Sequence, residues 1–154
     1  MAAARSTVWV NRLPVQGKEI PCLGRDFRLE GVPSPGYPCY RNALEALGCE
    51  VVDMPTTLET RFQPTVELLD RVVADGGSIA GLVLSSPSNP TGTMLDIDRM
   101  TQITSWCRAN GVWFVSDEIY HGLSYGEPAP TALQFDPDAI VINSFSKYFS
   151  MTGW

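Results

Sequence analysis

Residues 81–90 read GLVLSSPSNP, an apolar run that ends abruptly in a polar cluster. Two later stretches repeat this arrangement: VWFV at 112–115 leads into SDEIY at 116–120, and AIVI at 139–142 leads into NSFSK at 143–147. Short, continuous apolar runs are typical of strands that are buried on both faces of a parallel sheet. Because ligands collect beyond the carboxyl ends of such strands, we expect the three polar clusters to share one pocket.

Helical periodicity separates the predicted strands, which include a further one at Glu50–Met54. The predicted helical faces are Tyr40, Ala43, Leu44 and Leu47; Leu68, Leu69, Val72 and Val73; and Ile97, Met100, Ile103 and Cys107. The residues that suit helix boundaries are Gly48, Pro64, Gly76, Gly77 and Gly111. Strands that alternate with helices predict an α/β fold with a mainly parallel sheet, and right-handed crossovers place helices on both of its faces. We expect residues 1–31, which lack a clear period, to form an N-terminal segment of unclear structure, separate from residues 32–154.

Size and composition exclude several classes of protein. With 154 residues, of which 44% are hydrophobic, and a net charge of −6, the chain has enough material for one domain core. We find no basic stripe typical of nucleic-acid binding and no apolar stretch long enough for a membrane span. A single histidine, His121, argues against a Ser-His-Asp triad and against a histidine-rich metal site. Four cysteines without Cys-x-x-Cys spacing favour free thiols and the cytoplasm, and the basic residues within 1–18 leave a mitochondrial leader as the alternative.

The polar clusters contain a lysine, Lys147, with two chemical uses: a fixed cation for an anionic ligand, or an amine nucleophile toward a carbonyl. The neighbouring groups favour the second use. A carboxylate at Asp117 and a phenol at Tyr120 suit a heteroaromatic ring with a nitrogen and an oxygen substituent, and the hydroxyls of Ser144 and Ser146 suit a phosphate. Pyridoxal 5'-phosphate (PLP) carries all of these groups.

Four segments in a fixed order make a more specific match. They are PSPGYPCY at 33–40, SNPTG at 88–92, SDEIY at 116–120, and SFSK at 144–147 followed by MTGW at 151–154. From about Val32 onward the chain resembles the class I/II aminotransferases, which are fold type I PLP enzymes. The resemblance implies that the chain is a portion of the large, PLP-binding domain of that fold.

The resemblance implies catalytic roles for three of these residues, Lys147, Asp117 and Tyr120. Lys147 would form a Schiff base with PLP and, once released by the amino substrate, would move the proton between the substrate carbon and the cofactor. Asp117 would pair with the protonated ring nitrogen, which keeps the ring an electron sink.

The remaining roles concern cofactor binding. Tyr120, also a catalytic candidate, and Asn89 would hydrogen-bond the phenolic oxygen of the ring, and Tyr37 would stack on its face. Ser144 and Ser146 would bind the phosphate. The resemblance also implies a cis peptide bond between Asn89 and Pro90.

Every candidate also has a purely structural alternative. Lys147 alone reads as a solvated surface lysine, and Asp117 as a helix cap. Tyr120 reads as a core tyrosine and Tyr37 as a packed loop aromatic. Asn89, Ser144 and Ser146 read as turn residues.

The family pattern includes parts that the sequence does not show. An arginine would follow Gly153-Trp154, a small C-terminal domain would supply a second arginine, and a glycine-rich phosphate loop has no counterpart in residues 1–31. Because arginine–phosphate and arginine–carboxylate contacts are strong, we expect weakened binding. The expected function is PLP-dependent transamination between an amino acid and a 2-oxo acid, impaired in this chain, in what the resemblance implies is a homodimer. The alternatives are a PLP lyase or synthase of the same fold, or a non-catalytic fragment that docks on a partner.

Overall fold

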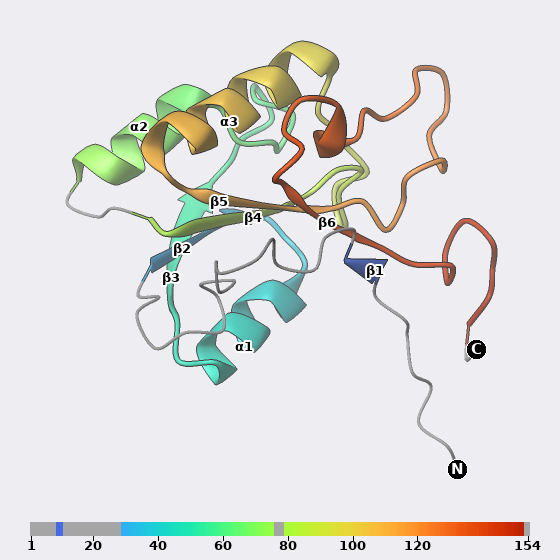
Figure 1. Cartoon of the computed structure of the whole chain (residues 1–154), viewed down its shortest axis with the longest axis horizontal. Coiled ribbons are helices and arrows are strands. Elements are labelled where there is room, and N and C mark those ends of the chain that lie inside the picture. The colour runs from blue at the N-terminus through green and yellow to red at the C-terminus, as the bar shows by residue number, and fades with distance from the viewer. Residues whose placement is uncertain (1–8, 11–28, 76–78, 153–154) are drawn as a thin grey trace.

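The computed structural model describes residues 9–10, 29–75 and 79–152 of the chain. Within them, six strands form one sheet in the order β1-β6-β5-β4-β2-β3 (Figure 1). The strands are β1 (Trp9–Val10), β2 (Leu29–Ser34), β3 (Glu50–Pro55), β4 (Gly81–Ser85), β5 (Trp113–Asp117) and β6 (Ile140–Asn143). Strands β2 to β6 run parallel, and β1 pairs antiparallel with β6. The predicted α/β fold with a mainly parallel sheet is confirmed.

Helices cover both faces of the sheet, as the crossover rule predicts. Helix α1 (Pro38–Ala46) lies on one face, and α2 (Val66–Ala74) and α3 (Ile97–Asn110) lie on the other (Figure 1). A short 3₁₀ helix, η2 (Ala132–Gln134), follows the long connection from β5. The larger hydrophobic core fills the space beneath α2 and α3, and a smaller one lies beneath α1. The sheet therefore lies between two separately packed layers.

Side-chain caps set the helix boundaries. Thr65 accepts a hydrogen bond from the amide of Leu68 at the start of α2, so that helix begins at Val66 and not at Pro64 as predicted. It ends at Ala74, and the glycines expected to close it, Gly76 and Gly77, lie outside the described residues. Helix α3 begins after Asp96, whose carboxylate accepts from the amide of Arg99, and ends at Gly111. The φ angle of 67° at Gly111 is the left-handed cap that glycine adopts most readily.

The predicted helical faces are right at five positions and wrong at four. Leu44, Leu69, Met100, Ile103 and Cys107 are buried, as expected. The exposed members of the predicted faces are Ala43, Leu47, Val73 and Ile97. Leu47 follows the last residue of α1 and Ile97 is the first residue of α3, so neither lies where its helix packs on the sheet.

The sequence analysis identifies no strand before residue 50, and this is wrong. Strand β2 pairs with both β3 and β4 in the interior of the sheet. Its sequence, LEGVPS, contains a glycine and a proline, which disfavour strands, and a glutamate, which is rarely buried. Since β2 begins at Leu29, it also crosses the predicted boundary between residues 31 and 32.

Burial on both faces is confirmed for β4 and only partly for the other two predicted runs. All five residues of β4 are buried. In β6, Val141 is buried while Ile140, Ile142 and Asn143 are half-buried. Because the outer neighbour of β6 is the two-residue strand β1, part of β6 remains accessible.

Strand β2 carries a buried carboxylate, Glu30, which is 2% exposed. Its Oε1 atom has no hydrogen-bond partner among the described residues, and burial raises the pKa of Glu30 from an ordinary 4.5 to about 7. The carboxylate lies against Gly81 of the neighbouring strand. A Cβ atom at position 81 would lie 2.1 Å from Oε2, so the glycine makes the room that Glu30 occupies.

The raised pKa of Glu30 predicts a pH dependence of stability. The folded chain holds the proton on Glu30 more tightly than the unfolded chain does. The contribution of this proton to the free energy of unfolding is therefore complete below pH 4.5 and is lost as the pH rises to about 7. Glu30→Gln should remove this decline in the free energy of unfolding. Urea denaturation at several pH values measures it, with Glu127→Gln at an exposed position as the control. Identical pH profiles for Glu30→Gln and the unsubstituted chain would contradict the prediction.

Candidate active site

The three polar clusters meet at one edge of the sheet, as predicted. Strand β4 ends at Ser85, β5 at Asp117 and β6 at Asn143. The strands are parallel, and their register places Asp117 beside Ser85 on one side and Ile142 on the other. Their carboxyl ends therefore present the residues that follow to a common space.

Asp117 is buried and both of its carboxylate oxygens are hydrogen-bonded. Oδ1 accepts from the amide of Ile119 at 2.9 Å, and Oδ2 accepts from the hydroxyl of Tyr40 at 2.5 Å. The contact to Ile119 is an Asx turn, which folds the chain back at the end of the strand. Since turns and not a helix follow Asp117, the helix-cap alternative is wrong.

Tyr40 is a site residue that the sequence analysis missed. The helical period predicts only a packing role for Tyr40, whereas its hydroxyl reaches from the first turn of α1 to the carboxylate at the end of β5. Burial raises the pKa of the phenol, and the hydrogen bond to Asp117 raises it further. Tyr40 therefore remains a protonated donor. Its spacing, three residues after Tyr37 at the start of a helix, was the available signal.

Tyr37, Tyr40 and Asn89 line the same cavity. The rings of Tyr37 and Tyr40 pack edge to face, with centroids 5.8 Å apart and planes at 80°. All three residues line a small cavity of about 10 Å³ between the start of α1 and the loop after β4. Tyr37 is 45% exposed, so part of its ring is accessible to a ligand. The peptide bond between Asn89 and Pro90 is cis, as the family resemblance implied.

A second residue that the sequence analysis missed, Gln63, holds the loop that carries Asn89. Gln63 is buried, and its amide nitrogen donates to the carbonyl oxygens of Ser85, at 3.3 Å, and of Thr93, at 3.1 Å. These two carbonyls bracket the 86–92 loop. A buried amide that bridges both ends of a loop restricts its conformations.

Lys147 and Tyr120 are neighbours. The ammonium nitrogen of Lys147 lies 5.8 Å from the centroid of the Tyr120 ring, which is within the range of a cation–π interaction. Tyr120 is half-buried, and Lys147 is exposed. The lysine is therefore accessible to a ligand from solvent.

Ser144 and Ser146 form a compact turn. The hydroxyl of Ser144 lies 2.6 Å from that of Ser146 and accepts from the amide of Ser146 at 2.9 Å. The amide of Ser144 donates to the side chain of Asn143 at 2.7 Å. The two hydroxyls are close enough to contact one anion, and the same geometry also fits the turn alternative.

Apart from the turn of Ser144 and Ser146, the contacts among the described residues organise the candidates into two groups. Tyr37, Tyr40 and Asp117 form one continuous chain of contacts, and Tyr120 with Lys147 forms the other. No hydrogen bond or ion pair joins Asp117 directly to Lys147 in this part of the chain. The turn that begins at Asp117 leads to Tyr120 and so connects the groups through the backbone.

Two negative findings concern the described residues alone. They contain no group of three or more histidine, cysteine, aspartate or glutamate side chains arranged to hold a metal ion. None of their helices has both the length and the apolar content that crossing a bilayer requires.

Comparison with known proteins defines the class. The family model for class I and II aminotransferases matches residues 31–154, so the chain belongs to this family. The chain is 52% identical over 123 residues to valine–pyruvate aminotransferase of Mycobacterium tuberculosis, which covers 79% of this chain and 31% of that protein. It is 34% identical over 126 residues to (5-formylfuran-3-yl)methyl phosphate transaminase of Methanocaldococcus jannaschii, which covers 80% of this chain and 30% of that one.

Solved structures agree with this assignment. An aminotransferase from Mycobacterium tuberculosis superimposes with a TM-score of 0.77 at 47% identity, over 88% of this chain and 36% of that one. The aromatic aminotransferase from Pyrococcus horikoshii gives a TM-score of 0.78 at 29% identity, over 86% and 36%. The fold is thus part of the fold of type I aminotransferases. The chain spans about a third of the length of the relatives that it matches.

The hydrogen bond between Tyr40 and Asp117 can be tested by removing one hydroxyl. Tyr40→Phe leaves a buried carboxylate oxygen without its donor, which should lower the free energy of unfolding by about 1–3 kcal/mol. Chemical denaturation measures the change. Tyr125→Phe, at a fully exposed tyrosine, is the matched control and should have no effect. Equal stabilities of the two variants would show that the contact contributes nothing.

Proposed function

We propose that this chain forms part of a PLP-dependent aminotransferase, which transfers an amino group between an amino acid and a 2-oxo acid. The observation that carries the proposal is the doubly hydrogen-bonded, buried carboxylate of Asp117 at the end of β5. A fixed carboxylate at the ligand-binding edge of a parallel sheet suits a protonated ring nitrogen. The family to which the chain belongs supports the reaction type.

The side chains at this edge fit the functional groups of PLP. The cofactor has a ring nitrogen, a phenolic oxygen, an aldehyde and a phosphate. Each carboxylate oxygen of Asp117 has a second lone pair, so it can still accept a hydrogen bond from the ring nitrogen. The hydroxyl of Tyr120 and the amide of Asn89 are donors suited to the phenolic oxygen. The exposed face of Tyr37 suits stacking on the ring.

Lys147, Ser144 and Ser146 supply the remaining groups. In the proposal the amine of Lys147 would bond to the aldehyde carbon, and the two neighbouring hydroxyls would bind the phosphate. When bound, PLP supplies a ring that takes up the negative charge developing at the substrate carbon. The ring takes up this charge best when its nitrogen is protonated, and the carboxylate of Asp117 would keep that proton in place.

The catalytic work of the chain then falls to three residues. Once the amino group of the substrate has displaced Lys147 from the aldehyde carbon, its neutral amine would take a proton from the substrate carbon and deliver one to the former aldehyde carbon. Tyr120 would donate a hydrogen bond to the phenolic oxygen, and its ring lies 5.8 Å from the Lys147 nitrogen. Asp117 would pair with the protonated ring nitrogen, and the hydroxyl of Tyr40 donates a hydrogen bond that keeps the carboxylate in position.

Substrates and assembly remain part of the proposal. The relatives include proteins named valine–pyruvate aminotransferase and LL-diaminopimelate aminotransferase, which supports an amino acid and a 2-oxo acid as the substrate pair. In the proposal, residues 32–154 belong to the large PLP-binding domain of a homodimer.

Unpaired cysteines at Cys39, Cys49 and Cys107 support a cytoplasmic location.

PLP binding through Lys147 has a direct spectroscopic test. The 154-residue chain mixed with PLP should develop a new visible absorption band that Lys147→Ala abolishes. Lys147→Arg should also lose it, because arginine keeps the charge and lacks a nucleophilic amine. The sequence has one other lysine, Lys18, so Lys18→Ala is the matched control and should keep the band. A band that survives Lys147→Ala, or that is absent from the unsubstituted chain, would refute the proposal.

A further inference from the structure

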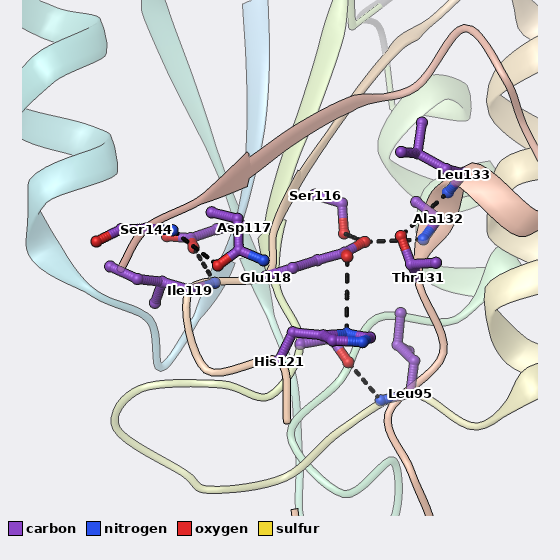
Figure 2. A network of polar contacts seen from close by, with 12 residues as sticks. Leu95, Ser116, Asp117, Glu118, Ile119, His121, Thr131, Ala132, Leu133 and Ser144 are labelled. Atoms are coloured by element: carbon purple, nitrogen blue, oxygen red, sulfur yellow. Dashed lines mark hydrogen bonds and ion pairs between the residues drawn. The ribbon is translucent and has the colours of Figure 1, made fainter. Parts of the chain in front are cut away.

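Glu118 follows Asp117 directly and has no part in the chemistry proposed above. Its side chain is 2% exposed. One carboxylate oxygen, Oε1, accepts from the hydroxyl of Ser116 at 3.1 Å and from the amide of Ala132 at 2.8 Å (Figure 2). A buried carboxylate is costly unless it is hydrogen-bonded, so these contacts are what allow Glu118 to occupy this position.

The contact to Ala132 closes a loop. Ala132 lies 14 residues after Glu118 and is the first residue of η2. Its amide has no partner within that short helix, because the first amides of any helix lack one. The segment between them, residues 119–131, contains Tyr120, passes through an exposed stretch at 125–128, and returns to the interior at the buried residues Ala129 and Pro130.

The backbone and the side chain of Glu118 bond to different elements. Its backbone amide donates to the carbonyl of Ile142 in β6 at 2.8 Å, while its side chain bonds to the start of η2. Figure 2 shows the side chain extending from the end of β5 toward Thr131 and Ala132. The carboxylate therefore joins the end of the sheet to the far end of the loop that carries Tyr120.

The surroundings offer little to replace this anchor. Glu118 lines a cavity of about 360 Å³ together with His121, Thr131, Asn143 and Ser144. The other carboxylate oxygen, Oε2, lies 3.8 Å from Nδ1 of His121, which is beyond hydrogen-bond distance. Because open space adjoins the carboxylate, a shorter side chain would leave the Ala132 amide without this acceptor.

We propose that Glu118 is a positioning residue that closes the 119–131 loop and thereby fixes the Tyr120 hydroxyl where it meets the phenolic oxygen of PLP. The inference rests on the proposed function, since that function gives Tyr120 its task. Glu118 does not touch the cofactor. It acts through the backbone of the loop, two residues before Tyr120.

The first measurement needs no cofactor. Hydrogen exchange in the 154-residue chain should show that Glu118→Ala removes the protection of the Ala132 amide and of the 119–131 loop, while β4 and α3 stay protected. Glu118→Gln keeps an acceptor oxygen and should restore protection. Ser116→Ala is the matched control, because it removes the other hydrogen bond to Oε1 and leaves the loop closed. Should Glu118→Ala not fold, Glu118→Met keeps most of the volume without an acceptor and decides the same point.

The second measurement asks whether Glu118 acts through Tyr120. Glu118→Ala should weaken PLP binding about tenfold, as expected for the loss of one well-placed hydrogen bond to a charged group. The pH midpoint of the Lys147-dependent band should shift as it does in Tyr120→Phe. The variant that combines Glu118→Ala with Tyr120→Phe should bind PLP no more weakly than Tyr120→Phe alone. The effects of two residues that act as one unit are not additive.

The outcomes separate the two hypotheses. Absence of the band from the unsubstituted chain removes the proposed function and this inference with it. Two outcomes would overturn the inference alone while the unsubstituted chain shows a normal band. In the first, the losses of PLP binding in Glu118→Ala and Tyr120→Phe add up in the double variant. In the second, Glu118→Ala leaves the loop unprotected and PLP binding unchanged. Unchanged exchange of the Ala132 amide in Glu118→Ala also overturns it.

Discussion

The site depends on a carboxylate that has been taken out of water at the end of a strand. Asp117 retains its place because a phenol from α1 and an amide from the following turn satisfy its oxygens. The hydrogen bond from Tyr40 spans 77 residues of sequence and ties the helix on one face of the sheet to the ligand-binding edge. Without such donors the buried charge would be expensive, so the position of α1 and the chemistry of the edge are determined together.

Side chains of consecutive residues in extended backbone point to opposite faces. Glu118, directly after β5, continues this alternation from Asp117, since its amide still pairs with Ile142 of β6. The carboxylate of Asp117 bonds to Tyr40, on the α1 side of the sheet. That of Glu118 bonds to Ala132, which belongs to the larger core on the side of α2 and α3. Two adjacent acids thus join the end of β5 to both packed layers. Tyr120 lies in the 119–131 loop, which follows directly.

Features with a local signal were predictable from the sequence, and features that depend on distant partners were not. The apolar run of β4, the period of α3 and the polar residues after each strand are all properties of short segments, so their placement was foreseen. Strand β2 lacks the composition of a strand and is defined by its neighbours on both sides. Tyr40, Gln63 and Glu118 owe their importance to partners 77, 30 and 14 residues away in sequence, which no local pattern reveals.

The fit between Glu30 and Gly81 has a consequence for how this sheet can diverge. The carboxylate occupies the volume that any side chain at position 81 would need. A side chain at position 81 would have to displace this carboxylate from the buried volume that it now fills. We therefore expect substitutions at positions 30 and 81 to affect one another, because β2 and β4 share this volume.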